Sequence, residues 1–265
     1  MLMYFRSFEP AINFAKQMLV KYGKPVPVGH WQGLNVKGKP DMVSYEVTNI
    51  HFSCEVSPDI DELKRQIEPN LPWADDHFLE RVGRVGLNPG EQYKNWPYYV
   101  RQKSNDVHRT EGGKFTHTYM ERIWPKATES EYWKGKNPLG IRYEYGDLDD
   151  LVNLLIREPL TRQAFLPIWF PEDTGAVHGG RVPCTLGYHF MRRDDKLHIW
   201  YPIRSCDFIR HFRDDIYLAC RLLLWVLDEV KRKDYDTWKD VIPGNLTMNI
   251  YSLHVFAAEI TSLRG

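Results

Sequence analysis

The feature that most constrains this chain is the segment 216–230, whose apolar side chains would cover nearly all faces of a helix. A helix that is apolar all round must be surrounded by other protein or by lipid. Arg221 interrupts the segment, which is also too short to span a bilayer. The sequence therefore predicts a helix at the centre of a protein core, with the rest of the chain supplying the layers around it.

The composition supports such a core. Hydrophobic residues make up 43% of the 265 residues and aromatic residues 14%, which argues against disorder and fits one large domain or two small ones. Lys+Arg and Asp+Glu balance at 35 each, so a protein that holds nucleic acid by bulk charge is not expected. Glu9 and Pro10 precede any apolar run of signal length, and we expect no secretion and no membrane span. Four cysteines are too few for a disulfide scaffold, which favours reduced thiols in a cytoplasmic protein.

Periodicity and turn signals place further elements around the central helix. Spacing of 3.6 residues predicts helices, and β-branched or alternating runs predict strands. The predicted helices are 7–21, 74–84 and 148–157; the predicted strands are 42–56, 163–170 and 247–256, with a hairpin at 186–203. Segments 28–41 and 87–114 are polar and rich in glycine and proline, and we predict that they are irregular. No composition shift marks a boundary, so residues 1–265 are predicted to form a single α+β domain.

Reactive and cationic residues gather late in the chain. Cys184 follows Pro183 at the start of a predicted strand, and a thiol becomes a nucleophile only where positive charge or donors stabilise the thiolate. Arg204 and Ser205 would suit a phosphate monoester, and Asp207 follows them. Each has an ordinary alternative, since a lone cysteine before a strand is usually structural and an Arg–Asp pair is usually a surface ion pair. No metal site is expected.

In combination, these residues resemble the thymidylate synthase family. Residues 183–219 hold a Pro-Cys nucleophile, a hairpin, an Arg-Ser-x-Asp motif and a base-reading position at the start of a buried helix, in that family's order and spacing. The resemblance extends over 115–256 and is faint over 1–114. It implies an α+β thymidylate-synthase-like fold, in which a mixed β-sheet packs against helices and a long buried central helix.

Two further motifs flank this segment. Arg162 and Gln163 resemble the family's phosphate-binding Arg-Arg pair, with glutamine at the second position. His254 and Phe256 resemble its His-x-Tyr motif, which holds the sugar 3′-hydroxyl. Phenylalanine lacks the hydroxyl, so the choice between ribose and deoxyribose stays open.

The base-reading position departs from the synthases. They carry asparagine there, which matches uracil, whereas this chain has Asp215. A carboxylate can accept a hydrogen bond from the amino group of cytosine and would oppose the O4 of uracil. Asp215, together with Thr185 after the nucleophile, resembles the phage deoxycytidylate hydroxymethylases, and in a phage the enzyme would work in the host cytoplasm. The alternative for Asp215 is an N-cap or a first-turn acid of the helix, and the two roles can coexist.

The resemblance implies a mechanism. Cys184 would add to C6 of a pyrimidine nucleoside monophosphate, and C5 would take a one-carbon unit from 5,10-methylenetetrahydrofolate. Tyr119 would relay the C5 proton, and Glu80, with Glu91 as its rival, would order the water. Hydroxymethylases finish by adding water and synthases by delivering hydride.

The resemblance also implies how the ligands are held. Arg204 and Ser205 would hold the 5′-phosphate, with Arg162 and Gln163 reaching across a homodimer. Asp207 would face the pterin and His254 the ribose. Trp96 and Trp124 would flank the folate, unless both are core aromatics.

Some expected parts are missing from the sequence. It shows no counterpart of the family's N-terminal phosphate-binding Arg loop, and only eleven residues follow His254, fewer than the closing segment of synthases needs. A site that stays open suits a reaction with water. The prediction is a hydroxymethylase acting on deoxycytidylate (dCMP). The alternatives are a methylating or hydroxymethylating enzyme for CMP or dUMP, and a non-catalytic nucleotide-binding homologue.

Overall fold

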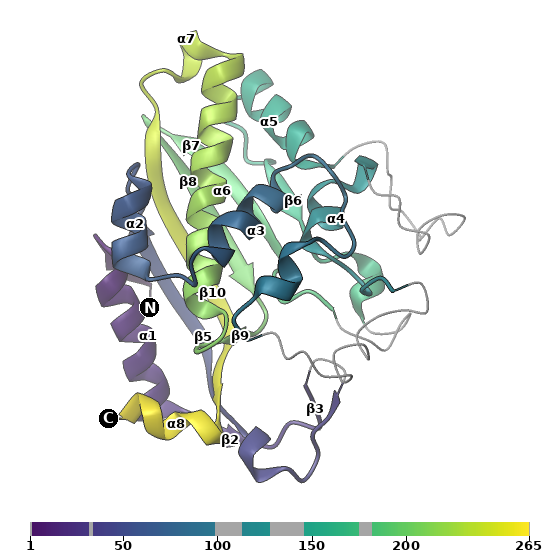
Figure 1. Cartoon of the computed structure of the whole chain (residues 1–265). Helices are drawn as coiled ribbons and strands as arrows, with labels where there is room; N and C mark the ends of the chain where they lie inside the picture. The colour runs from purple at the N-terminus through teal and green to yellow at the C-terminus, as the bar shows by residue number, and fades with distance from the viewer. Residues whose placement is uncertain (1, 32–33, 99–112, 128–145, 175–181, 265) are drawn as a thin grey trace.

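The computed structural model describes residues 2–31, 34–98, 113–127, 146–174 and 182–264. Its centre is an eight-stranded sheet in the order β1-β5-β10-β8-β7-β6, with β2 added to β5 and β9 to β10 (Figure 1). The strands are β1 (Met3–Phe5), β2 (Lys24–Val26), β5 (Ser44–Glu55), β6 (Phe165–Pro167), β7 (Gly187–Arg193), β8 (Lys196–Ile203), β9 (Cys206–Asp207) and β10 (Ile242–Phe256). The sheet is mixed, because β10 pairs antiparallel with β5 and parallel with β8.

The predicted central helix is the longest helix of the described chain. It is α6, Phe212–Lys233, which begins before the predicted segment and ends after it. Its apolar residues are almost all buried, and it packs against β8 and β10 on one side and α2, α3 and α5 on others. Phe212 meets Phe52 of β5 edge to face, with the ring centroids 6.2 Å apart. The prediction of a long buried helix against a mixed sheet is confirmed.

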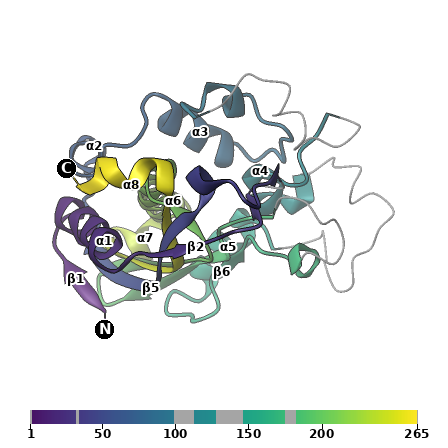
Figure 2. The ribbon, with the colours of Figure 1, turned by 90° about the horizontal axis from the view of Figure 1, so that it is seen from below.

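The other helices are α1 (Phe8–Tyr22), α2 (Ile60–Ile67), α3 (Trp73–Arg81), α4 (Tyr119–Ile123), α5 (Leu148–Arg157), α7 (Tyr235–Trp238) and α8 (Ala257–Arg264). Figures 1 and 2 show α1, α2, α3 and α6 gathered on one side of the sheet. Side chains alternate accordingly along β8, where Leu197 and Ile199 are buried while His198 and Trp200 keep part of their surface. Helices α1, α2, α3 and α6 therefore cover one face, and the alternate side chains of β8 on the other face stay half-exposed.

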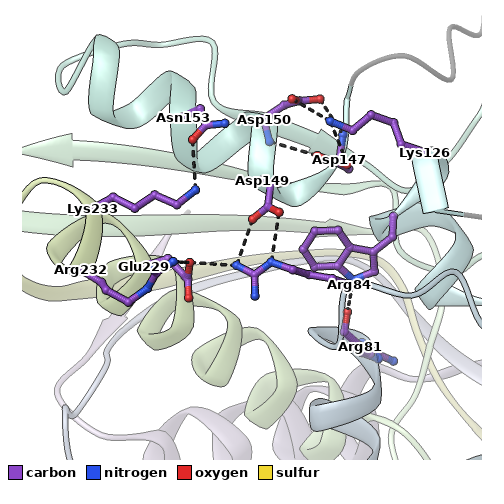
Figure 3. A network of polar contacts seen from close by, with 11 residues as sticks. Arg81, Arg84, Lys126, Asp147, Asp149, Asp150, Asn153, Glu229, Arg232 and Lys233 are labelled. Atoms are coloured by element: carbon purple, nitrogen blue, oxygen red, sulfur yellow. Dashed lines mark hydrogen bonds and ion pairs between the residues drawn. The ribbon is translucent and has the colours of Figure 1, made fainter.

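Arg84 connects the end of α3 to helices α5 and α6. It follows α3 in the left-handed backbone region, with φ 59°, and pairs with Asp149 of α5 at 3.1 Å and Glu229 of α6 at 2.9 Å (Figure 3). The guanidinium also lies over the ring of Trp225, 5.2 Å from its centroid. Arg84 thus fixes the end of α3 against the two helices beside it.

Several element boundaries differ from the sequence prediction. β10 begins at Ile242, before the predicted residue 247, because a bulge between Pro243 and Leu246 lets the strand continue past a proline. β6 covers only Phe165–Pro167 of the predicted 163–170. The hairpin is confirmed as β7 and β8, turning through Asp194 at φ 53°.

The segments predicted to be irregular hold some short elements. Segment 28–41 contains the pair β3 (His30–Trp31) and β4 (Leu34–Asn35), followed by the 3-10 helix η1 (Pro40–Met42). Of 87–114, the part 99–112 lies outside the described residues, and the remainder includes the 3-10 helix η2 (Gln92–Asn95). The 3-10 helices η4 (Pro125–Ala127) and η5 (Pro171–Thr174) were not predicted. None of the helices in the described ranges has the length and apolar character needed to cross a membrane.

Candidate active site

Cys184 lies just before β7, and Arg204 holds the segment that carries it. The Arg204 backbone N–H donates to the Cys184 carbonyl at 2.9 Å, and its guanidinium donates to the carbonyls of Pro183 at 2.8 Å and Val182 at 3.1 Å. One guanidinium nitrogen lies 3.9 Å from the Cys184 sulfur. A cation at this distance favours the thiolate. Of the four cysteines, only Cys184 is partly exposed.

A chain of hydroxyl groups begins at the next residue. Thr185 is fully buried, and its Oγ1 lies 2.9 Å from the Tyr201 hydroxyl and 3.1 Å from the Tyr119 hydroxyl. Burial raises the pKa of Tyr119 and of Tyr201, and the negative charge that Cys184 carries as a thiolate raises the pKa of Tyr119 further. Both phenols therefore stay protonated at neutral pH and are able to hold or pass a proton close to the thiol.

Asp215 lies in the first turn of α6, partly buried. Its carboxylate accepts a hydrogen bond from the Cys206 thiol at 3.5 Å, whereas its neighbour Asp214 accepts from the backbone and side chain of Asn70, both at 2.8 Å. Burial raises the pKa of Asp215 to about 7, against the opposing charge of Arg81. Asp215 is one of two acidic residues in the first turn of α6, as the alternative explanation predicted, and its base-reading role stays a prediction.

Sequence reasoning missed Arg81, at the end of α3. Its guanidinium carbon lies 4.2 Å from the centre of the Tyr119 ring, and its Nε donates to His77 Nε2 at 3.0 Å. Arg81 is 8% exposed. The only signal in the sequence was its position four residues after His77, which places both on one helix face.

The contacts of Glu80 are with residues other than those around Cys184. Its Oε1 accepts from the backbone N–H groups of Glu91 and Gln92, the second at 3.2 Å, and its Oε2 lies 3.6 Å from His77 Nδ1. Glu91, the rival for the catalytic role, has an 83% exposed side chain near Lys94. In the structure Glu80 fixes the backbone of residues 91 and 92 to α3, and its catalytic role stays a prediction.

Asp207 and His254 are brought together as neighbours on paired strands, β9 and β10. Both carboxylate oxygens of Asp207 are already engaged: Oδ1 accepts from the backbone of Ile209 and Arg210, each at 3.0 Å, and Oδ2 from the Arg210 guanidinium at 2.9 Å. Burial lowers the pKa of His254, so its ring is neutral at pH 7. Phe256 is 2% exposed beneath Arg210 and therefore offers little surface to a sugar.

The phosphate residues predicted from the two motifs lie apart. Ser205 is partly buried and follows Arg204, which contacts Cys184. Arg162 and Gln163 are exposed before β6, which runs antiparallel to β7, so they lie towards the end of β7 that is farther from Cys184. The Arg162 carbonyl lies 3.0 Å from His189 Nε2, which confirms that direction. Within one protomer these two groups do not meet.

The two tryptophans predicted to flank a folate have different environments. Trp124 is 2% exposed and donates to the Arg81 carbonyl at 2.7 Å, so it packs in the core, as the alternative to a folate contact predicted. Trp96 is half-buried and stacks on His211, with centroids 4.8 Å apart and planes at 8°. Its Nε1 has no hydrogen-bond partner among the described residues. A planar heterocycle that carries hydrogen-bond acceptors, such as a pterin, has the chemistry to stack on this pair and to accept from Trp96 Nε1. The described residues hold no cluster of metal ligands.

Comparisons with known proteins agree with this geometry. No family model matches the chain. A protein of Methanosarcina barkeri named "Putative thymidylate synthase" is 28% identical over 151 residues, which are 51% of this chain and 64% of that protein. A protein of the same name from Methanosarcina mazei is 27% identical over 158 residues, covering 52% of this chain and 68% of that protein. The thermostable thymidylate synthase A from Bacillus subtilis superposes with a TM-score of 0.65 over 97% of this chain and 82% of its own, at 15% identity.

The fold is that of the thymidylate synthases. The resemblance to the thymidylate synthase family is confirmed, in fold over nearly the whole chain and in sequence over about half of it. The chain spans less than two thirds of the length of the Methanosarcina barkeri relative.

Proposed function

We propose that the protein transfers a one-carbon unit to C5 of a pyrimidine nucleoside monophosphate, with 5,10-methylenetetrahydrofolate as the donor. The observation that carries the proposal is that Cys184 lies beside the Arg204 guanidinium and directly precedes Thr185, whose hydroxyl contacts that of Tyr119. A nucleophile, a cation that favours its thiolate and a proton-relay group are thereby within one site. The thymidylate-synthase-like fold and the relatives support the same chemistry.

The chain's own residues suit the steps at the base. The Cys184 thiolate forms a bond to C6, and the electron pair of the C5–C6 double bond becomes available at C5. The donor, when bound, would supply a carbon at the oxidation level of formaldehyde, and tetrahydrofolate would leave. Water would add to that carbon to give the hydroxymethyl group, and the Cys184–C6 bond would break to restore the thiolate and the C5–C6 double bond. Tyr119 would pass on the proton that C5 loses, a role that its hydroxyl contact with Thr185 and the Thr185–Tyr201 contact support. Trp96 and His211 would hold the donor by stacking.

We propose deoxycytidylate as the substrate and a hydroxymethyl group as the product: Asp215 supports cytosine as the base, and the sugar and the product rest on the resemblance to the deoxycytidylate hydroxymethylases. An ionised Asp215 accepts from the amino group at C4, which uracil lacks. Arg204 and Ser205 would meet the phosphate. The half-exposed sheet face and the remote, exposed Arg162 support a homodimer in which Arg162 serves the partner's site.

Release of tritium from [5-³H]dCMP, CMP and dUMP, with and without methylenetetrahydrofolate, tests the proposal. We expect release that depends on the folate and is fastest from dCMP, and a product whose mass shows a hydroxymethyl group. Cys184→Ala should abolish release, whereas the control Cys220→Ala, which removes a buried thiol of α6, should retain it. Absence of release from all three nucleotides by the folded protein would leave only a binding function, and a methyl product would make it a methylase.

A further inference from the structure

Arg81 is a buried cation for which the described residues offer no carboxylate at ion-pair distance. It is 8% exposed, and its Nε donates to His77 Nε2 at 3.0 Å. The guanidinium lies on the face of the Tyr119 ring, whose centre is 4.2 Å from the guanidinium carbon. Burying a guanidinium without a counter-ion costs free energy, and contact with a ring face offsets only part of it. The place of Arg81 over Tyr119 therefore calls for a reason beyond local stability.

His77 sets the direction of the guanidinium. Because His77 Nε2 accepts the hydrogen bond from Arg81, its ring is a neutral imidazole with the proton on Nδ1. The same ring stacks on Trp73, with the centroids 4.9 Å apart and the planes at 16°, which restricts its rotation. Arg81 Nε is thus bound to an acceptor that is itself held in place, and the plane of the guanidinium follows from that bond.

Helix α4 contacts Arg81 at both of its ends. Trp124, which follows the helix, donates from its indole to the Arg81 carbonyl at 2.7 Å. Tyr119 is the first residue of α4, and the capping box formed by Thr118 and Glu121 fixes that end of the helix. The backbone of Arg81 is therefore bound at one end of α4, while its guanidinium covers the ring at the other end.

The placement of the Tyr119 ring decides where its hydroxyl lies. The hydroxyl is 3.1 Å from Thr185 Oγ1, which is in turn 2.9 Å from the Tyr201 hydroxyl. Thr185 directly follows Cys184 in the chain. A group that takes a proton must be within hydrogen-bond reach of it, so a displaced Tyr119 ring would leave the base without its acceptor. The guanidinium on the face of the ring opposes such a displacement.

We propose that Arg81, oriented by His77, is the positioning residue for proton transfer from C5: its guanidinium keeps the Tyr119 hydroxyl against Thr185, and its charge stabilises the negative charge that grows on the phenol oxygen during the transfer. This role rests on the proposed function and deepens it. The phenol oxygen takes the proton from C5 and passes its own to Thr185. Each hydroxyl gives up one proton for each that it takes, and the proton ends in water. The C5–H electron pair forms the double bond to the transferred carbon, while the electron pair of the carbon–nitrogen bond leaves with tetrahydrofolate.

The test combines Arg81→Gln with Tyr119→Phe, which removes the hydroxyl and leaves the ring that Arg81 covers. Alone, Arg81→Gln should lower kcat for folate-dependent tritium release from [5-³H]dCMP by about tenfold or more, since a proton-transfer group contributes about a hundredfold or more. The KM for dCMP should not change, because the contact acts in the transition state. In the Tyr119→Phe background, the same substitution should have no further effect on kcat. Arg81→Lys, which keeps the charge, should recover part of the rate.

Arg84→Gln is the matched control, because Arg84 lies just beyond the same helix and its guanidinium covers Trp225 instead of Tyr119. It should leave kcat unchanged. A loss from Arg81→Gln that persists in full in the Tyr119→Phe background, or one that falls on KM instead of kcat, would overturn the proposal, since Arg81 would then support the fold in general. If Arg81→Gln fails to fold, Arg81→Lys and His77→Phe provide the same cycle, with smaller losses in kcat that should again disappear in Tyr119→Phe.

A second measurement needs no turnover. In protein labelled with [4-¹³C]tyrosine, the Tyr119 signal is the one that Tyr119→Phe lacks. This signal should shift in Arg81→Gln and stay in place in Arg84→Gln; an unmoved signal in Arg81→Gln would contradict the positioning role. Failure of the proposed transfer reaction would show separately, as absence of tritium release by the wild type, and the ¹³C signal would still decide whether Arg81 positions Tyr119.

Discussion

The ion pair between Arg122 and Asp173 gives a stringent test of the structure, because both side chains are buried, at 1% and 0% exposure. It is bidentate, with both N–O distances 2.8 Å, and Asp173 also accepts from the Phe170 backbone at 2.8 Å. Asp173→Asn removes one charge of the pair and leaves the other buried. Breaking a buried pair in this way costs about 3–5 kcal/mol.

The free energy of unfolding from urea titration is the measurement. Asp149→Asn is the control, because Asp149 pairs with Arg84 through side chains that are 32% and 43% exposed, and exposed pairs contribute at most about 1 kcal/mol. We expect Asp173→Asn to lose at least about 2 kcal/mol more than the control. Since Arg122 lies on α4 with Tyr119, tritium release should fall as well. Equal losses in the two variants would refute the reasoning that the Arg122 guanidinium depends on this carboxylate.

Three other perturbations have defined outcomes. Thr185→Val keeps the shape but removes the hydroxyl between Tyr119 and Tyr201, so tritium release should fall about a hundredfold while circular dichroism stays unchanged; unimpaired release would exclude the hydroxyl chain from proton transfer. Asp215→Asn should shift tritium release from dCMP towards dUMP, and an unchanged preference would show that this residue does not read the base. The pKa of His77 is depressed to about 4, so the neutral ring stabilises the fold above the unfolded value of about 6.5, and this contribution is lost as the pH falls from there to about 4. It amounts to about 3 kcal/mol at most, and His77→Gln should flatten the fall in unfolding free energy over that range; an equally steep fall in the variant would contradict it.

The sequence predicted the parts of the site that are local in the chain or written as ordered motifs. The hairpin brings Arg204 back to Cys184 because two strands joined by a short turn must run side by side, so motif spacing translates directly into contact. The buried character of α6 followed from composition alone, since no polar face was available to meet water. Both predictions depended on constraints that operate within some twenty residues.

The contacts that the sequence could not predict lie between segments that are distant in the chain. Trp124 looks the same in sequence whether it meets a ligand or the core, and only its bond to Arg81 places it in the core. Asp207 carries the family's motif, yet the partners that occupy it come from a turn and, through Arg210, from a helix near the end of the chain. Arg81 shows no local sign of its position over the Tyr119 ring, because α4 follows far along the sequence.

Helix α8 has a consequence for how the chain should be handled. The Glu259 carboxylate accepts two hydrogen bonds from the Arg210 guanidinium, at 2.8 and 2.7 Å, and the same guanidinium donates to the Asp207 carboxylate. Helix α8 therefore holds Arg210, the side chain that pairs with Asp207. A fusion that displaces α8 should leave the sheet intact and free the Arg210 guanidinium from Glu259, so a purification handle attached to this helix would change how the Asp207 carboxylate is held.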